Sequence, residues 1–317
     1  MQSNTRRTPR RRSLYLLSAA AIAAVILCPF ANAQTDLGRV IPAGQGLHIV
    51  AFGDYGSGSS HQHDVAAAIA KRHAQSPFNM GITMGDNFYR CGVRNVEDPL
   101  WQSRWEDLYT PLGIPFFVSL GNHDYGHPPI ICPLQQASAD AEVQYTMRSR
   151  SWRMPARYYT FAAGPARFFN IDTEGWSQEQ LHWLAKALAA SKDEPGIVWR
   201  IVYGHHPIYT SGVHLNQRRI GELRRELVPL FKEYNVNLYI AGHDHDMEHL
   251  RSDGMDFLIC GAAGAELRRV RHQQKNSLFT DTVYGFLDIT IDQKKIDATF
   301  YDTKLKSLEN PAMSQAK

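Results

Sequence analysis

GDNFY, residues 85–89, directly follows an apolar run, residues 78–84, that predicts a buried β-strand. Asp86 therefore leaves a strand end, and in open α/β sheets ligand sites gather at the carboxyl ends of strands. Tyr89 adds a phenol on the same turn. A carboxylate with a phenol suits a hard, highly charged cation such as ferric iron. Taken alone, the motif also fits a helix cap beside a packed tyrosine, so its interpretation depends on the rest of the chain.

The same pattern recurs at the ends of four other predicted strands. In each, a glycine that permits a close backbone turn accompanies residues able to bind metal. The five turns are GDYG (53–56), GDNFY (85–89), GNHD (121–124), GHHP (204–207) and GHDH (242–245). They offer seven candidate ligands, which is what two neighbouring ions with one shared ligand need: Asp54, Asp86, Tyr89, Asn122, His205, His243 and His245.

The alternation in the last turn has its own geometry. In an extended turn, residues i and i+2 point the same way. We therefore expect His243 and His245 to share one direction, and Asp244 to point toward the backbone or toward a partner that supports the ligands.

Strands and helices alternate first, and a run of strands closes the chain. This order predicts an α/β (α+β) fold with two mixed β-sheets packed face to face and helices outside. Residues 125–155 are expected to form a long loop with one short helical piece. Ser177 is expected to cap a helix with Gln180 as its capping-box partner. The predicted strands are 48–52, 78–84, 114–120, 157–163, 166–171, 197–203, 236–240, 256–260, 284–291 and 295–301, and the predicted helices are 64–73, 99–109, 177–190 and 217–234.

The first 33 residues read as a secretory signal. A basic start of five arginines precedes an apolar run, residues 14–30, and Ala31-Asn32-Ala33 offers small residues for cleavage. A membrane anchor of signal length is the alternative, and the export route, general secretory or twin-arginine, stays open. We expect residues 34–317 to form a single catalytic domain, located in the periplasm or secreted, with no stable membrane anchor after cleavage.

Charge and cysteines fit this view. The whole chain is formally +3, and because its first 33 residues carry five arginines and no acid, the rest carries about −2. Nothing in that balance indicates nucleic-acid binding.

Cys260 lies in an apolar run and predicts a buried thiol, whereas Cys91 and Cys132 each follow a motif strand. A disulfide between these two is a hypothesis that a mass shift on reduction and alkylation would test.

The set of motifs resembles the calcineurin-like metallophosphoesterases, and among them the purple acid phosphatases of the small, tartrate-resistant type. Ordinary members of the superfamily carry Asp-x-His in the first motif, whereas this chain has Gly56 at the histidine position and gains Tyr89. The resemblance runs from Ile49 to about Tyr301. It implies a metallophosphoesterase-type sandwich.

Carried over residue by residue, the resemblance implies a site for Fe(III) and a site for a second divalent ion, which could be iron, zinc or manganese. Asp86 would bridge the two ions. His123 and His214 match positions near the substrate and are the predicted catalytic residues. The implied ferric ligands are Asp54, Asp86, Tyr89 and His245, and the implied divalent ligands are Asp86, Asn122, His205 and His243.

The resemblance implies an acid phosphatase, a phosphoric monoester hydrolase in which a metal-bound hydroxide attacks phosphorus. Its partners would be small phosphomonoester substrates, and we expect a monomer. A phosphodiesterase or a nucleotide or pyrophosphate hydrolase of the same superfamily is an alternative, because the motifs define the metals and not the leaving group. A non-hydrolytic di-iron redox or binding protein is a further one. A basic run of Arg268, Arg269 and Arg271 is expected to be a solvated face, and a basic rim that attracts phosphate is the alternative.

Overall fold

The structure is a computed structural model that describes residue 1 and residues 35–126, 132 and 137–314. Contacts group Asn32–Lys317 into one compact unit. Apart from its first residue, the predicted signal lies outside the described residues, so the signal and the domain boundary at residue 34 stay predictions. In the described part of the chain, no helix combines the length and the apolar character needed to cross a membrane.

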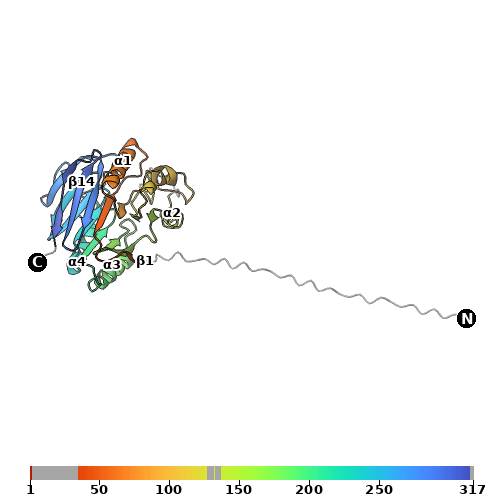
Figure 1. Cartoon of the computed structure of the whole chain (residues 1–317), viewed down its shortest axis with the longest axis horizontal. Coiled ribbons are helices and arrows are strands. Elements are labelled where there is room, and N and C mark those ends of the chain that lie inside the picture. The colour runs from red at the N-terminus through yellow and green to blue at the C-terminus, as the bar shows by residue number, and fades with distance from the viewer. Residues whose placement is uncertain (2–34, 127–131, 133–136, 315–317) are drawn as a thin grey trace. The chain divides into compact units, whose positions relative to one another are not determined.

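Two mixed sheets build the fold, which confirms the predicted sandwich (Figure 1). The first sheet contains, in spatial order, β1 (Thr35–Ile41), β6 (Tyr159–Ala163), β7 (Ala166–Asn170), β8 (Trp199–Tyr203), β9 (Leu238–Ala241), β11 (Met255–Cys260), β10 (Met247–Ser252) and β12 (Ser277–Asp281). The second contains β15 (Ser307–Glu309), β14 (Lys295–Asp302), β13 (Gly285–Ile291), β2 (Leu47–Phe52), β3 (Met80–Met84), β4 (Phe116–Ser119) and β5 (Trp152–Arg153), with β16 (Ala312–Ser314) paired to β14.

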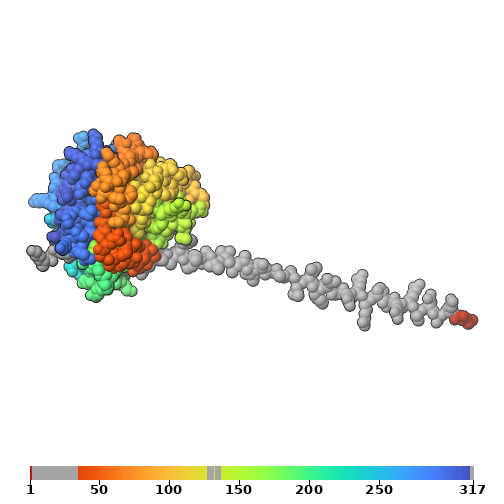
Figure 2. All heavy atoms as spheres, viewed as in Figure 1, coloured from red at the N-terminus to blue at the C-terminus, as the bar shows by residue number. Residues whose placement is uncertain are grey.

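Parallel pairing dominates the centre of each sheet. Strands β2, β3, β4 and β5 are parallel neighbours, and so are β7, β8, β9 and β11. Strand β13 joins the late part of the chain to β2 in antiparallel pairing. In Figure 2 the C-terminal residues, in blue, accordingly lie directly beside the orange surface of the early chain.

Four α-helices accompany the sheets in the described residues. Helix α1 (Ser60–Gln75) packs near β13 of the second sheet, and α2 (Ala139–Tyr145) is the short helix predicted within the long loop. Helices α3 (Gln178–Ala190) and α4 (Arg218–Glu233) share one apolar cluster with strands of the first sheet, and Figure 1 shows them together, well away from α1. Each large apolar side chain that they bury contributes about 1.5–3 kcal/mol.

The predicted helix at 99–109 differs from the structure. The chain there forms a wide π-helical turn, η1 (Gln102–Glu106), and then a 3-10 turn, η2 (Thr110–Leu112). Trp101 and Trp105 of this segment are nonetheless buried. The turn places the Arg104 guanidinium against the backbone carbonyls of two motif turns, those of Gly56 and Tyr89. A π-helical turn beside a candidate site is a common association.

Only one of the two hydrogen bonds predicted for the capping box at Ser177 is present. The Ser177 Oγ accepts a hydrogen bond from the N–H of Gln180 and so caps α3. The Gln180 side chain does not return to Ser177, because it bonds the backbone N–H and C=O of Asp172 at 2.8 and 3.0 Å. These backbone groups are buried, and buried backbone groups need partners.

Candidate metal centre

The five motif turns meet at one edge of the sandwich. GDYG, GDNFY and GNHD follow β2, β3 and β4, and GHHP and GHDH follow β8 and β9. Because these strands are parallel within each sheet, their carboxyl ends lie at the same edge. Backbone hydrogen bonds join the turns in pairs: the Asp54 N–H donates to the Gly85 carbonyl, and the Gly242 N–H donates to the His205 carbonyl, each at 3.0 Å.

Three of the candidate ligands have a left-handed backbone. The φ angles of Asp54, Asp86 and His243 are 57°, 52° and 70°. Such angles are uncommon for residues other than glycine, and they cluster where a fold holds functional side chains in fixed directions. The His243 N–H donates to Asp54 Oδ2 at 2.8 Å, so one such turn fixes the next.

One group of donors, which we call the Tyr89 cluster, surrounds the tyrosine hydroxyl. This oxygen lies 2.8 Å from Asp86 Oδ2, 3.1 Å from Asp54 Oδ1 and 3.2 Å from His245 Nε2. Both carboxylates are buried, at 0% and 2% exposed for Asp54 and Asp86. Four ligand atoms therefore face one small volume, and the cluster consists of Asp54, Asp86, Tyr89 and His245.

A second group, the Asn122 cluster, adjoins the first. His205 Nε2 lies 3.0 Å from Asn122 Oδ1, 3.1 Å from His243 Nδ1 and 3.5 Å from Asp86 Oδ1. Asp86 thus presents one carboxylate oxygen to each cluster. Ligand atoms of Asp54, Asp86 and His205 all lie within 4.8 Å of one another, and these residues could hold a metal ion. The Asn122 cluster consists of Asp86, Asn122, His205 and His243.

The three cluster histidines are oriented from outside. Each places its outer ring nitrogen against an oxygen that can only accept, so that nitrogen carries a proton and the other ring nitrogen is directed at the cluster. Metal-binding histidines are normally held in this way. The pairs are His205 Nδ1 with the Met84 carbonyl at 2.8 Å, His245 Nδ1 with the Glu266 carbonyl at 2.7 Å, and His243 Nε2 with the Gln217 side-chain oxygen at 2.8 Å.

The electrostatics also favour cations. Burial, with the charges of Asp54 and Asp86, raises the pKa of Tyr89 well above its ordinary value. Burial, with the neighbouring histidines His206 and His205, lowers the pKa of His243, which keeps that imidazole neutral. A metal ion would suit both side chains, since it stabilises the phenolate of Tyr89 and binds the neutral imidazole of His243. The donor set and its surroundings therefore fit a pair of metal ions.

Gly56 explains why the first motif lacks a histidine. A Cβ atom at this position would lie 1.7 Å from the Asn87 carbonyl oxygen. The backbone of the GDNFY turn occupies the space, so no side chain fits there. The same turn brings Tyr89 into the cluster, and the exchange of one donor for the other is a matter of packing as well as of chemistry.

A buried acid that we did not predict holds the central turn. The Asp124 carboxylate accepts hydrogen bonds from the backbone N–H groups of Asn87, Phe88 and Gly121. The Asn87 amide donates both to Asp124 and to Glu142 of α2. Burial and the charge of Asp86 raise the pKa of Asp124 to about 7. Asp124 is part of the GNHD motif, so its alternation with Asn122 was the available signal, whereas nothing in the sequence marked Glu142 or Gln217.

The two predicted catalytic histidines adjoin different clusters, His123 the Tyr89 cluster and His214 the Asn122 cluster. His123 Nε2 is 4.0 Å from Asp86 Oδ2, and its Nδ1 bonds the Arg90 carbonyl. The His214 ring lies 4.1 Å from the His243 ring, measured between centroids. Asp244 points away from the clusters, as predicted, and its Oδ1 lies 2.7 Å from His214 Nδ1.

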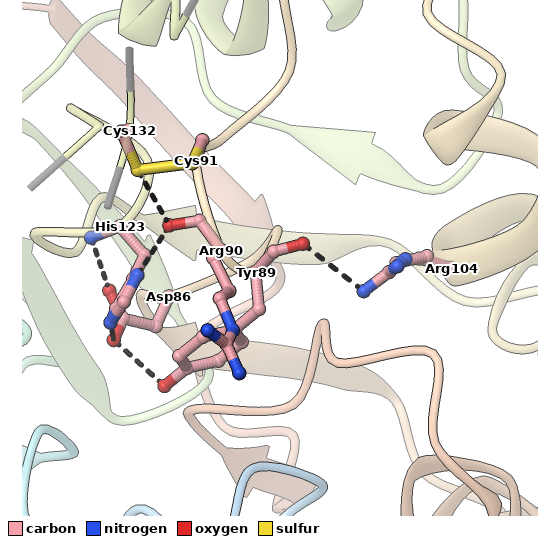
Figure 3. The surroundings of a disulfide bond; sticks show 7 residues. All are labelled: Asp86, Tyr89, Arg90, Cys91, Arg104, His123 and Cys132. Carbon is pink, nitrogen blue, oxygen red and sulfur yellow. Dashed lines mark hydrogen bonds and ion pairs between the residues drawn. A yellow bond between two sulfur atoms is a disulfide. The ribbon is translucent and has the colours of Figure 1, made fainter.

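The predicted disulfide is present. Cys91 and Cys132 are bonded, and Cys260 is a buried free thiol, as expected. Figure 3 shows the disulfide next to Arg90, whose carbonyl orients His123, with Asp86 and Tyr89 close by. The bond therefore ties the loop that follows Tyr89 to the loop that follows His123.

Comparison with known proteins places the chain in a family. Residues 47–247 match the family described as "Calcineurin-like phosphoesterase", and this span contains all five motifs. The chain belongs to the calcineurin-like phosphoesterase family. The predicted family is thereby confirmed, and so is the general class of activity, that of phosphoesterases.

Proteins similar in sequence include a tartrate-resistant acid phosphatase and a purple acid phosphatase. Tartrate-resistant acid phosphatase type 5 of Rattus norvegicus is 29% identical over 306 residues, which cover 83% of this chain and 88% of the relative. Purple acid phosphatase 4 of Arabidopsis thaliana is 26% identical over 290 residues, which cover 83% of this chain and 82% of the relative. This phosphoesterase is thus related to acid phosphatases at modest identity.

Solved structures share the fold. The purple acid phosphatase PPD1 of yellow lupin superposes with a TM-score of 0.68 at 18% identity, over 86% of this chain and 55% of that one. GAP50 of Plasmodium, described as an anchor in the inner membrane complex, superposes with a TM-score of 0.75 at 24% identity, over 86% of this chain and 90% of that one. The fold is therefore found both in a phosphatase and in a protein described as an anchor, so function has to be argued from the site.

Proposed function

We propose that this phosphoesterase is an acid phosphatase, a phosphoric monoester hydrolase with two metal ions, exported to the periplasm or secreted. The observation that carries the proposal is the pair of donor clusters that share Asp86. One carboxylate with an oxygen in each cluster can bridge two ions, and two neighbouring ions suit in-line displacement at phosphorus.

The two clusters suggest different ions. The Tyr89 cluster, with its carboxylates and phenol, suits Fe(III). The Asn122 cluster, with imidazoles and an amide, suits a divalent iron, zinc or manganese ion. When bound, the ions would supply Lewis acidity for activating water and for neutralising the phosphoryl oxygens. Because a trivalent ion acidifies water strongly, we expect an acid optimum.

His214 and His123 would serve the substrate. Asp244 holds His214 by Nδ1, and its other carboxylate oxygen accepts from Thr210 at 2.5 Å. His214 Nε2, the nitrogen that Asp244 does not bind, would hydrogen-bond the phosphoryl group or, when protonated, protonate the leaving oxygen. His123, held by the Arg90 carbonyl, would donate to the phosphoryl group through its other ring nitrogen.

The export proposal is supported by the disulfide. Disulfides persist mainly in oxidising compartments. The mass of the mature protein would test it: cleavage after residue 33 supports export, and an intact N-terminus in the exported fraction contradicts the predicted signal.

The first test is a visible absorption spectrum with a metal analysis, recorded for the native protein and for Tyr89→Phe. Tyrosinate bound to ferric iron gives a charge-transfer band. A band that disappears in the variant supports the ferric site. A colourless protein with two zinc or manganese ions would agree with a phosphoesterase but would contradict both the ferric site and the expected acid optimum.

The second test is the ratio of rates on 4-nitrophenyl phosphate and bis(4-nitrophenyl) phosphate. A monoesterase prefers the first. Preference for the second would favour a phosphodiesterase, and the absence of both activities in the metal-loaded protein would favour a non-hydrolytic role.

A further inference from the structure

Arg268 lies beside the proposed substrate histidine and does not fit the solvated face predicted for its basic run. Arg269 and Arg271 are exposed, in agreement with that prediction. Arg268 is half-buried, and its Nη1 lies 3.0 Å from His214 Nε2. One arginine of the three is thus directed at the site, and the other two point to solvent.

The loop that carries Arg268 is fastened to the Tyr89 cluster. The Arg268 N–H donates to the His245 carbonyl at 3.1 Å, and two residues earlier the Glu266 carbonyl accepts from His245 Nδ1 at 2.7 Å. Two hydrogen bonds to the same ligand histidine fix the backbone on both sides of Leu267. The backbone at Arg268 is therefore tied to the position of the cluster.

The Arg268 guanidinium has no carboxylate partner among the described residues. Arg157 and Arg251, by contrast, pair with Asp140 and Asp256. A guanidinium keeps its charge at any physiological pH and has five N–H donors, of which a single imidazole nitrogen satisfies one. A half-buried cation with spare donors therefore stands at the edge of a site proposed for phosphate.

His214, the hydrogen-bond partner of Arg268, is itself held in a fixed orientation. Asp244 binds His214 Nδ1, and the His214 ring packs on the His243 ring with 4.1 Å between centroids. Arg268 can only donate, so His214 Nε2 accepts from its Nη1, and the two groups meet next to the Asn122 cluster. An oxygen that entered between them would accept from Arg268 and, with His214 protonated at Nε2, from His214 as well.

We propose that Arg268 and His214 together bind one non-bridging oxygen of the substrate's phosphoryl group, and that Arg268 makes the site prefer phosphomonoesters over phosphodiesters. This inference rests on the proposed phosphatase function. A monoester offers one more non-bridging oxygen and one more ionisable group than a diester. An additional guanidinium, which binds phosphate through charge-assisted hydrogen bonds, therefore stabilises the monoester more.

The test compares Arg268→Gln with Arg269→Gln in the protein as purified with its metals. Both variants remove one charge from the same loop, but only the first removes the contact with His214. We expect Arg268→Gln to lower kcat/KM for 4-nitrophenyl phosphate by about 10- to 100-fold and for bis(4-nitrophenyl) phosphate by less than about threefold. Arg269→Gln should change neither by more than about twofold. Equal losses on the two esters would overturn the selectivity, and identical behaviour of the two variants would overturn the contact.

Binding of inorganic phosphate, measured by calorimetry, separates this inference from the phosphatase proposal. If the native protein hydrolyses neither ester, the phosphatase proposal fails, but phosphate binding still decides about Arg268. A Kd raised about tenfold in Arg268→Gln and unchanged in Arg269→Gln supports the contact. An equal Kd in both overturns it. Should Arg268→Gln lose its metals, Arg268→Lys replaces it, and an intermediate rise in Kd is then expected because lysine keeps the charge without the planar fork.

Discussion

The Tyr89 cluster and the Asn122 cluster share Asp86 but differ in charge. The first adds a carboxylate, a phenol and one imidazole, and the second adds an amide and two imidazoles. The surroundings increase the contrast, because burial and the two carboxylates raise the pKa of Tyr89, whereas burial and the neighbouring histidines lower the pKa of His243. One site is therefore rich in anionic oxygen, and the other is built mainly from neutral donors.

This difference teaches how a single bridging residue can serve two unlike ions. Hard anionic oxygens select a highly charged ion, and imidazole suits a divalent one. The asymmetry begins at Gly56, where the space for a histidine is filled by the Asn87 backbone. If the clusters are independent apart from Asp86, variants should separate them, and the following predictions test this.

The largest effect is expected for Asp86→Ala, which removes the shared ligand. Both ions should be lost and turnover should fall by roughly 1,000-fold or more, because the catalytic unit loses both of its cations. Metal analysis and the visible spectrum measure this, with the exposed Asp64→Ala as a control for loss of a carboxylate. Full retention of one ion would show that Asp86 serves a single site.

The next effect is expected for Asn122→Ala. The divalent ion should be lost or bound about 100-fold more weakly, while the ferric ion and its visible band remain, because Asn122 belongs to one cluster only. Turnover should fall with the divalent ion. Tyr89→Phe is the matched opposite, expected to lose the band and keep the divalent ion. Loss of the visible band in Asn122→Ala would show that the two clusters are not independent.

A smaller effect is expected for Gln217→Ala. Its side-chain oxygen orients His243, and loss of such a supporting hydrogen bond weakens metal binding by about 10- to 100-fold. The divalent affinity should fall and the visible band should stay. The neighbouring exposed Asn216→Ala is the control. Equal affinities in the two variants would mean that Gln217 does not orient the ligand.

The smallest effect concerns a histidine outside both clusters. His249 bonds Asp256 at 2.7 Å and Glu309 at 3.0 Å, so both of its ring nitrogens face carboxylates. Burial acts to lower its pKa, but these hydrogen bonds outweigh burial and raise the pKa to about 8. It is thus charged where the cluster histidine His243 is neutral, and its role is to hold β15 to β10 and β11.

For His249 the pH dependence follows from the raised pKa. The stabilisation of the folded state is complete below the ordinary pKa of about 6.5 and is lost as the pH rises through about 8. His249→Gln should therefore lower the free energy of unfolding by about 1–2 kcal/mol at pH 6 and by little at pH 9. Thermal unfolding at the two pH values measures this, with the exposed His63→Gln as control. A loss of the same size at both pH values would contradict the ion pairs.

Sequence patterns were sufficient where hydrophobicity and strand ends coincide. The central strands β2, β3, β4, β8 and β9 are fully apolar or nearly so, and each ends in a glycine-containing polar turn. Strands at or next to the sheet edges were missed. Strand β1 is mostly exposed, and β10 contains Glu248, His249 and Arg251, so only pairing with neighbouring strands orders them.

The sequence by itself determined the family, the two-sheet fold and the seven candidate ligands, because each ligand follows one of five strands within a few residues and local pattern is enough to mark it. Only the tertiary structure decided which residues surround those ligands. Gln217, Glu142 and Arg268 reach the site from a helix start, a second helix and a distant loop. No local period or spacing links such residues to the site, since the contacts arise when separate segments pack against one another.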